Sequence, residues 1–288
     1  MEKVAILGGD QREEILIKEL FKKNYVLNVL KKESDFKPKQ IFYSDELQKV
    51  VKNVDTVIAP LSGTDEMGRL KTTFINSEVT LDKEFFNLVN DDILLLIGSV
   101  NQEIKDIIDN KEIELVELAS LDQLAIMNAI PTAEGAIEIA MEETDITIYQ
   151  SNTLVLGLGK VGLTLAWRLK ALGSHVYSAT RNKGVIARGK DLGLGMVDYK
   201  ELNQYLPQID IIFNTVPALI LDEIYLSKVK DDVFIIDLAS SPGGTDFEYA
   251  DDNNIRAMLA PGLPGKVAPV TAGKILGEII PELISEYK

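Results

Sequence analysis

The chain has 288 residues, of which 46% are hydrophobic and 26% are charged, and its formal net charge is −15. This composition is typical of a globular protein, and the length predicts two domains of about 150 residues each. The absence of cysteine excludes disulfides, thiolate metal sites and a cysteine nucleophile, and the single histidine, His175, excludes a multi-histidine metal centre.

The excess of acidic residues makes nucleic acid and anionic membranes poor partners, because like charges repel one another. No apolar run approaches the roughly 18 residues that a membrane-spanning helix needs, and residues 1–10 lack the apolar core of a signal peptide. We therefore expect a cytoplasmic protein that binds no metal, no nucleic acid and no membrane.

The first half alternates short apolar segments with amphipathic ones, a pattern typical of parallel strands connected by helices. Ile15, Leu16 and Leu20 would share one face of a helix, and the charged stretch 31–39 predicts a loop. The expected strands are Val4–Leu7, Tyr25–Leu30, Thr56–Ala59, Ile93–Ile97 and, from a weaker pattern, Ile113–Val116.

The second half shows the same alternation more clearly. The expected strands are Thr153–Leu156, Val176–Ala179, Met196–Val197, Ile209–Phe213, Val233–Ile236 and Ile255–Leu259. Six strands with intervening helices complete a dinucleotide-binding fold. We predict an α/β protein with an N-terminal domain at 1–128 and a Rossmann dinucleotide-binding domain at 129–266.

Two prolines mark the helices that we expect at the domain junctions. Pro131 suits the first turn of a long connecting helix, and Glu134 would lie in that same turn, where the helix dipole favours an acid. A last helix is expected from Val267 to about Glu286, with Pro281 kinking or ending it. We expect this C-terminal helix, 267–288, to complete the N-terminal domain.

The strongest local signal is a G-x-G-x-x-G motif between an expected strand and an expected helix. It consists of Gly157, Leu158, Gly159, Lys160, Val161 and Gly162. The first glycine permits a tight turn, the second lets backbone N–H groups approach a diphosphate, and the third allows close helix–strand packing. The motif predicts a dinucleotide site. The alternatives are a Rossmann domain without ligand and one that binds S-adenosylmethionine.

The end of the second strand of this domain bears on the choice of nucleotide. NAD and S-adenosylmethionine sites usually place a carboxylate there for the ribose hydroxyls. This chain has Thr180, Arg181 and Asn182 instead, and a guanidinium binds phosphate bidentately. We therefore predict contacts from these three residues and NADP as the cofactor, with NAD as the alternative. A solvated arginine is the other interpretation of Arg181.

Ligands of such domains bind at the carboxyl ends of the parallel strands, so the loops that follow the strands form the candidate site. In the second domain the expected cofactor contacts are Thr215, Val216, Pro217, Leu238 and Ala239, and the expected substrate contact is Ser240. Lys266 lies in a Gly- and Pro-rich loop that enters a helix, an arrangement that suits the capture of a carboxylate.

The N-terminal domain offers two similar places. Arg12 follows the first strand in an early helical turn and could anchor a carboxylate, although a surface salt bridge is an equal alternative. The loop after the third expected strand contributes Ser62, Gly63 and Thr64, and Thr132 of the connecting helix completes the expected substrate contacts.

Taken together, these segments resemble the dipicolinate synthase family, and within it the A subunit. The matching segments are Gly8–Arg12, Asn128–Ile137, Gly157–Gly162, Asn214–Ala218, Asp237–Gly244 and Ala260–Gly273. The resemblance implies two Rossmann-like, doubly wound domains similar to those of D-2-hydroxyacid dehydrogenases. It also implies a flavoprotein-like B subunit as partner. The implied reaction is oxidation of a dihydrodipicolinate-type ring to pyridine-2,6-dicarboxylate, in the mother-cell cytoplasm during sporulation.

The implied product carries two carboxylates, which fits the cations and helix N-termini of the candidate site. We expect Glu134 to transfer a proton and Lys266 to hold a carboxylate, although Glu134 could equally be an acid at a helix start. A non-catalytic subunit that binds nucleotide and dicarboxylate is the rival function. A different dehydrogenase is a third, which the lack of a suitably placed histidine disfavours. A homo-oligomer is also possible.

Overall fold

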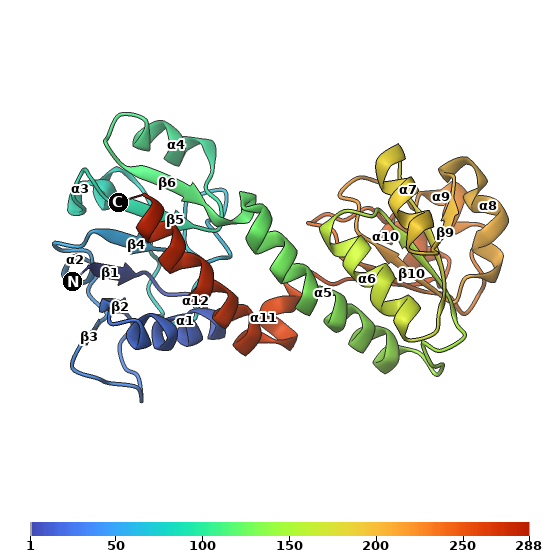
Figure 1. The fold of residues 1–288 in the computed structure, drawn as a ribbon. Helices are drawn as coiled ribbons and strands as arrows, with labels where there is room; N and C mark the ends of the chain where they lie inside the picture. The colour runs from blue at the N-terminus through green and yellow to red at the C-terminus, as the bar shows by residue number, and fades with distance from the viewer. Residues whose placement is uncertain (1, 288) are drawn as a thin grey trace. The chain divides into compact units, whose positions relative to one another are not determined.

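The computed structural model describes residues 2–287, and the chain divides into two compact units. Unit 1 comprises Met1–Ala125 and Pro269–Lys288, and unit 2 comprises Ile126–Ala268. Each unit is a six-stranded parallel sheet with helices around it (Figure 1). Numbered along each unit, both sheets have the strand order 3-2-1-4-5-6, the order of doubly wound dinucleotide-binding folds.

Unit 1 contains the strands of the order β3-β2-β1-β4-β5-β6. These are β1 (Lys3–Ile6), β2 (Val26–Leu30), β3 (Ile41–Ser44), β4 (Thr56–Ile58), β5 (Leu94–Ile97) and β6 (Glu114–Glu117). The sequence did not predict β3. This strand lies at the sheet edge, and of its short apolar run Ile41–Tyr43 only Ile41 is buried.

The helices of unit 1 include the C-terminal helix. They are α1 (Gln11–Lys22), α2 (Leu47–Val50), α3 (Lys83–Leu88), α4 (Gln102–Ile108) and α12 (Pro269–Glu286), with a 3₁₀ turn at Leu118–Ser120. The α12 helix lies beside α1 (Figure 1). The approach is close, because a Cβ placed on Gly273 would lie 2.5 Å from the carbonyl oxygen of Arg12.

Of the two effects expected of Pro281, a kink or an end of the helix, the end is excluded, because α12 continues to Glu286. A proline within a helix has no N–H for the carbonyl four residues earlier, here that of Gly277. The Nζ of Lys23, just after α1, donates a hydrogen bond to that carbonyl at 2.9 Å. The helix therefore tolerates the proline with this backbone acceptor satisfied.

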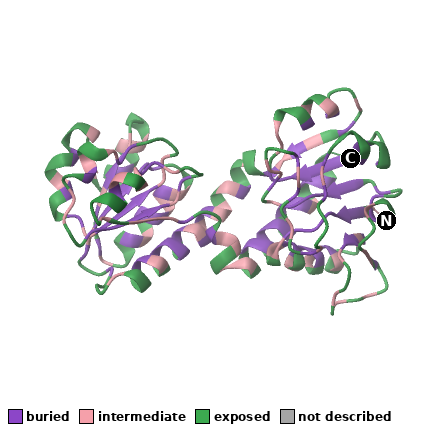
Figure 2. Cartoon of the chain, turned by 180° about the vertical axis from the view of Figure 1, so that it is seen from behind, coloured by how far each residue is buried: buried purple, intermediate pink, exposed green. Residues whose placement is uncertain are grey.

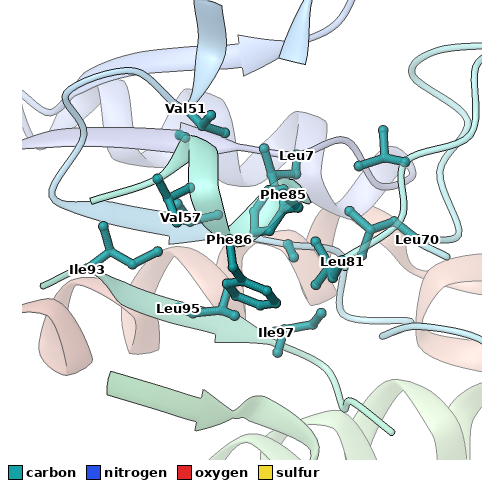
Figure 3. Close-up of a cluster of buried hydrophobic side chains, with 14 of the residues drawn as sticks. Leu7, Val51, Val57, Leu70, Leu81, Phe85, Phe86, Ile93, Leu95 and Ile97 are labelled. Atoms are coloured by element: carbon teal, nitrogen blue, oxygen red, sulfur yellow. The ribbon is translucent and has the colours of Figure 1, made fainter. Parts of the chain in front are cut away.

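One core cluster of unit 1 packs around α3, and α1 and α12 bury further apolar side chains such as Leu16 and Ile280. Phe85 and Phe86 of α3 pack edge to face, with ring centroids 5.0 Å apart. Leu7, Leu81 and Leu95 surround them (Figure 3). The strands consist mostly of buried residues, whereas the helices also carry exposed ones (Figure 2). This core fixes the carboxyl ends of the strands, where the candidate loops begin.

Unit 2 repeats this topology with the order β12-β11-β10-β7-β8-β9. Its strands are β7 (Asn152–Leu156), β8 (His175–Ala179), β9 (Gly195–Val197), β10 (Ile211–Asn214), β11 (Phe234–Asp237) and β12 (Arg256–Leu259). Its helices are α6 (Lys160–Ala171), α7 (Lys183–Asp191), α8 (Leu202–Tyr205), α9 (Glu223–Leu226), α10 (Phe247–Asp252) and α11 (Leu263–Val267), with 3₁₀ turns at Tyr199–Glu201 and Leu206–Gln208. All six expected strands of this half are present.

The connecting helix differs from its prediction. It is α5 (Asp122–Glu143), so Pro131 and Glu134 lie inside it rather than in its first turn. The residues before the proline, including Leu124, Ala125 and Met127, favour helix and extend it toward the N-terminus. Among the residues described, no helix is long and apolar enough to cross a membrane.

Candidate functional site in unit 2 and the family of the chain

The glycine-rich turn after β7 has the geometry that its three glycines require. Gly157 has a φ of +83°, and a Cβ there would lie 2.6 Å from Thr215 Oγ1. A Cβ on Gly162 would lie 2.0 Å from the carbonyl oxygen of Gly157. A Cβ on Gly159 would meet nothing within 4 Å. The first and third glycines are therefore needed for packing, whereas the second opens toward solvent.

The N-terminus of α6 follows directly from this turn. Gly159 is the N-cap of this 12-residue helix, and as a glycine it has no side chain to accept hydrogen bonds from the first-turn N–H groups. Such N–H groups, together with the helix dipole, favour an anion. The corresponding helix of unit 1, α1, is capped by its own residues, Asp10 and Glu13. The helix after the first strand thus has a side-chain cap in unit 1 and none in unit 2, and the open helix N-terminus in unit 2 suits a diphosphate.

A basic pocket of about 550 Å³ lies at the carboxyl end of β8. It is lined by Thr180, Arg181, Lys183, Ile186, Lys190, Met196, Val197, Asp198, Tyr199, Lys200 and Glu201. The guanidinium carbon of Arg181 lies 5.6 Å from the ring centroid of Tyr199. The Tyr199 hydroxyl donates a hydrogen bond to the carbonyl of Ala179 at 3.3 Å, and burial raises its pKa. Four cations against two carboxylates make this pocket suited to an anion.

Two of the expected cofactor contacts have structural partners as well. The Oδ1 of Asn182 caps α7 by accepting hydrogen bonds from the N–H groups of Gly184 and Val185. The Thr215 hydroxyl donates to the carbonyl of Leu156 at 2.9 Å, which places it against the glycine-rich turn. Asn182 and Thr215 therefore shape the walls of the candidate site.

Val216, Pro217, Leu238 and Ala239 lie in the loops that follow β10 and β11. Pro217 is exposed, whereas Ala239 is buried and donates its N–H to Asp237 Oδ1 at 3.0 Å. Asp237 was not singled out from the sequence, because an acid that ends an apolar strand gives no sign of its partners. It is fully buried and accepts four hydrogen bonds.

Glu134 and Lys266 lie on two helices of unit 2 that contact each other. A Cβ on Gly135 would lie 2.8 Å from Val267 Cγ2, so α5 and α11 approach closely next to both residues. Both side chains are exposed. Glu134 Oε1 lies 3.6 Å from Arg168 Nε. On the same helix as Glu134, the Thr132 hydroxyl donates to the carbonyl of Asn128 at 2.7 Å.

In unit 1, Arg12 forms an ion pair within its own loop. Its Nε donates to Asp10 Oδ1 at 2.9 Å and its Nη2 to Asp10 Oδ2 at 2.7 Å. The salt bridge that the sequence left open as an alternative is therefore present. The guanidinium is fixed at the N-terminal turn of α1, beside the carboxyl end of β1.

The neighbouring Glu13 connects the two loops at the switch point of unit 1. Its side chain is 1% exposed; Oε2 accepts from the N–H of Asp10 at 2.8 Å, and Oε1 accepts from the N–H of Leu61 at 3.0 Å. Burial raises the pKa of this carboxyl group. Sequence reasoning assigned Glu13 no role, although a glutamate three residues after Asp10 is the signature of a capping box.

The loop that Glu13 contacts contains the other expected substrate residues of unit 1. Ser62 donates its hydroxyl to the carbonyl of Lys71 at 3.2 Å. Gly63 has a φ of +69°, and a Cβ there would lie 2.5 Å from the carbonyl of Ser99. The buried hydroxyl oxygen of Thr64 has no hydrogen-bond partner. The loop is therefore tightly packed at Gly63, and the Thr64 hydroxyl is buried without a hydrogen bond.

Comparison with known proteins assigns the chain to a family. Residues 3–119 match the model of the N-terminal domain of the dipicolinate synthase A subunit. Residues 131–242 match that of the D-isomer specific 2-hydroxyacid dehydrogenase, NAD binding domain. The A subunit of dipicolinate synthase from Bacillus subtilis (strain 168) is 37% identical, over 99% of this chain and 97% of that protein.

Solved structures agree with this assignment. The crystal structure of the dipicolinate synthase A subunit from Bacillus halodurans has a TM-score of 0.91 at 36% identity, covering 98% of this chain and 97% of that chain. Apo D-lactate dehydrogenase from Escherichia coli has a TM-score of 0.65 at 13% identity, covering 98% and 95%, and shows the fold alone. The predicted Rossmann-like fold of the D-2-hydroxyacid dehydrogenase type is confirmed. The chain belongs to the family of dipicolinate synthase A subunits, and its second unit is a dehydrogenase-type NAD-binding domain.

Proposed function

We propose that this chain oxidises a dihydrodipicolinate-type ring to pyridine-2,6-dicarboxylate, with NADP as the hydride acceptor. The observation that carries the proposal is the pairing of two anion sites in unit 2. The open N-terminus of α6 at Gly159 suits the diphosphate, and the basic pocket around Arg181 suits the 2′-phosphate. Both lie at the carboxyl edge of the sheet, where dinucleotides bind.

The residues present fit this cofactor. The space beside Gly159 admits a diphosphate backbone, because a Cβ there would meet no atom within 4 Å. No carboxylate stands at Thr180 or Arg181 to bind ribose hydroxyls in the NAD manner, and Lys183 and Lys200 add positive charge to the pocket. When bound, the nicotinamide takes up a hydride.

The chemical demand on the protein is small, because the product ring is aromatic. The dihydro ring loses one hydride, which passes to the nicotinamide, and one proton, which passes to a base or to water. The protein must orient the ring and accept that proton. We assign the proton to Glu134 and one ring carboxylate to Lys266. Within unit 2, the other candidate contacts to a dicarboxylate are Thr132 and Ser240; within unit 1, the candidates are Arg12, Ser62, Gly63 and Thr64.

Membership of this family also supports a proposal for the partner and the setting. We propose that the chain works with a flavoprotein-like B subunit in the mother-cell cytoplasm of sporulating bacteria. The rival function is a non-catalytic subunit that binds nucleotide and dicarboxylate and leaves the chemistry to that partner.

One experiment separates the two functions. The purified chain is given NADP⁺ and the dihydro compound, with and without the B subunit, and the absorbance of pyridine-2,6-dicarboxylate is followed. A rise with the chain alone supports catalysis by this chain. A flat trace that rises only when the partner is added supports the binding role, and a flat trace in both cases contradicts the proposed reaction.

A further inference from the structure

A buried carboxylate fixes the loop that follows β11. Asp237 ends this strand, and its Oδ2 accepts hydrogen bonds from Asn214 Nδ2 at 3.0 Å, Gly244 N at 2.8 Å and Thr245 Oγ1 at 2.8 Å. Its Oδ1 accepts from Ala239 N at 3.0 Å. One side chain therefore holds both ends of the loop 238–245 and the last residue of β10.

Asn214 extends this network to the loop that follows β10. Its Oδ1 accepts from the N–H of Val216 and its Nδ2 donates to the Val216 carbonyl, both at 3.1 Å. A Cβ on Gly244 would lie 2.4 Å from the carbonyl oxygen of Ala218, so the two loop backbones are in direct contact. Asn214 and Asp237 are both fully buried. The bases of the two loops thus form one hydrogen-bonded block.

The exposed residues of these two loops include Pro217, Ala218 and Ser240. They stand over the half of the sheet formed by β10, β11 and β12. In a dinucleotide fold of this order, the nicotinamide half of the cofactor lies over these strands and the adenosine half over the other three. The block therefore underlies the part of the site where the hydride moves.

We propose that Asp237 is a positioning residue for hydride transfer: it touches no reactant and fixes the two loops that hold the nicotinamide and the ring beside it. The inference rests on the proposed function. A displacement of about 1 Å at such a site lowers a rate by roughly 100-fold, whereas the adenosine and diphosphate contacts lie elsewhere on the sheet.

The first test is Asp237→Asn, which keeps the shape of the side chain. In this variant the amide oxygen can accept from the three donors around Oδ2. The amide NH₂ group then faces the N–H of Ala239, so that two donors meet without an acceptor. We expect kcat for pyridine-2,6-dicarboxylate formation to fall by roughly 10- to 100-fold. We expect the Kd for NADP⁺, measured by calorimetry, to change by less than about threefold.

A second pair of variants keeps the test valid if Asp237→Asn folds poorly. Thr245→Val removes one donor to Asp237 and keeps the shape, whereas Thr245→Ser keeps the hydroxyl. The value of kcat should fall in the first and recover in the second. Thr153→Val is the matched control. Thr153 in β7 is also buried, and the variant loses a 2.8 Å hydrogen bond to the hydroxyl of Ser174, just before β8 and away from the two loops.

The outcomes are distinct. A lower kcat with unchanged NADP⁺ affinity in Asp237→Asn and Thr245→Val, absent from Thr153→Val, supports the inference. A kcat in these variants equal to that of Thr153→Val overturns it and leaves the proposed function standing. A wild-type chain that neither binds NADP⁺ nor turns over, with the B subunit present, overturns the proposed function and the inference with it.

Discussion

The guanidinium of Arg181 lies over the ring of Tyr199, with 5.6 Å between the guanidinium carbon and the ring centroid. The Tyr199 hydroxyl donates a hydrogen bond to the carbonyl of Ala179 at the end of β8. The fixed ring therefore holds the Arg181 cation in the lining of the basic pocket. If this cation binds the 2′-phosphate, Arg181→Ala should weaken NADP⁺ binding by roughly 10- to 100-fold, the value of a charged hydrogen bond. Binding of NAD⁺, which lacks that phosphate, should barely change.

The matched control for this prediction is Arg188→Ala. Arg188 is exposed on the neighbouring helix α7 and forms an ion pair with Asp191 at 2.9 Å outside the pocket. In calorimetric titrations with both nucleotides, Arg188→Ala should show the wild-type ratio of NADP⁺ to NAD⁺ affinity. If Arg181→Ala also shows the wild-type ratio of NADP⁺ to NAD⁺ affinity, the assignment of NADP as the cofactor is wrong.

The glycines of the turn after β7 should separate folding from binding. Gly159→Ala places a methyl group in open space at an extended φ of −73°, so the free energy of unfolding should change by less than about 1 kcal/mol. The methyl group would occupy the path of the diphosphate, and NADP⁺ affinity should fall by roughly tenfold or more.

Gly157→Ala, by contrast, should mainly lower the stability of the fold. The φ of +83° and the 2.6 Å approach to Thr215 predict a loss of more than about 1 kcal/mol of stability. Urea denaturation and calorimetry on both variants check the pair. Unchanged nucleotide affinity in a folded Gly159→Ala variant would count against a diphosphate at this turn.

The buried Glu13 predicts a pH dependence of stability. Burial raises its pKa above the ordinary 4.5, so the folded state binds this proton more tightly than the unfolded state does. Its contribution to the free energy of unfolding is largest below pH 4.5 and is lost as the pH rises through the raised pKa. Glu13→Gln does not titrate. The difference in unfolding free energy, wild type minus variant, should therefore fall with rising pH in urea titrations; a difference that stays constant or grows would show that this carboxyl group does not behave as described.

Glu134 carries the proposed proton transfer. General-base catalysis is worth about 10² to 10⁴ in rate, so Glu134→Gln should lower kcat by at least roughly 100-fold. Glu138→Gln, also exposed and one turn further along α5, should retain kcat. Steady-state kinetics of the two variants compare them directly, and full turnover by Glu134→Gln would end this assignment.

The sequence predicted the inner strands well, because strands buried on both faces appear as continuous apolar runs such as Ile211–Phe213. It did not predict β3, a short edge strand in which Phe42 is exposed. The start of α5 was also misplaced. Pro131 suits a helix start, but the helix-forming residues before it decide where α5 begins.

The sequence predicted those parts of the candidate site that depend on residues close together in the chain. The glycine motif fixes its own turn, so Gly157, Gly159 and Gly162 could be assigned one by one. The hydrogen-bond partners of Asp237 and Glu13 could not be predicted. Each carboxylate accepts bonds from groups distant in sequence, and only the folded chain brings Asn214 or Leu61 beside it.

If a hydride passes from the dihydro ring to NADP⁺ on this chain, an isotope label will follow it. The most direct measurement uses a ring deuterated at its saturated carbons and analyses the nucleotide product by mass spectrometry. The account predicts deuterium in the NADPH, formed in proportion to pyridine-2,6-dicarboxylate. Unlabelled NADPH, or the aromatic product without any reduction of the nucleotide, would contradict it.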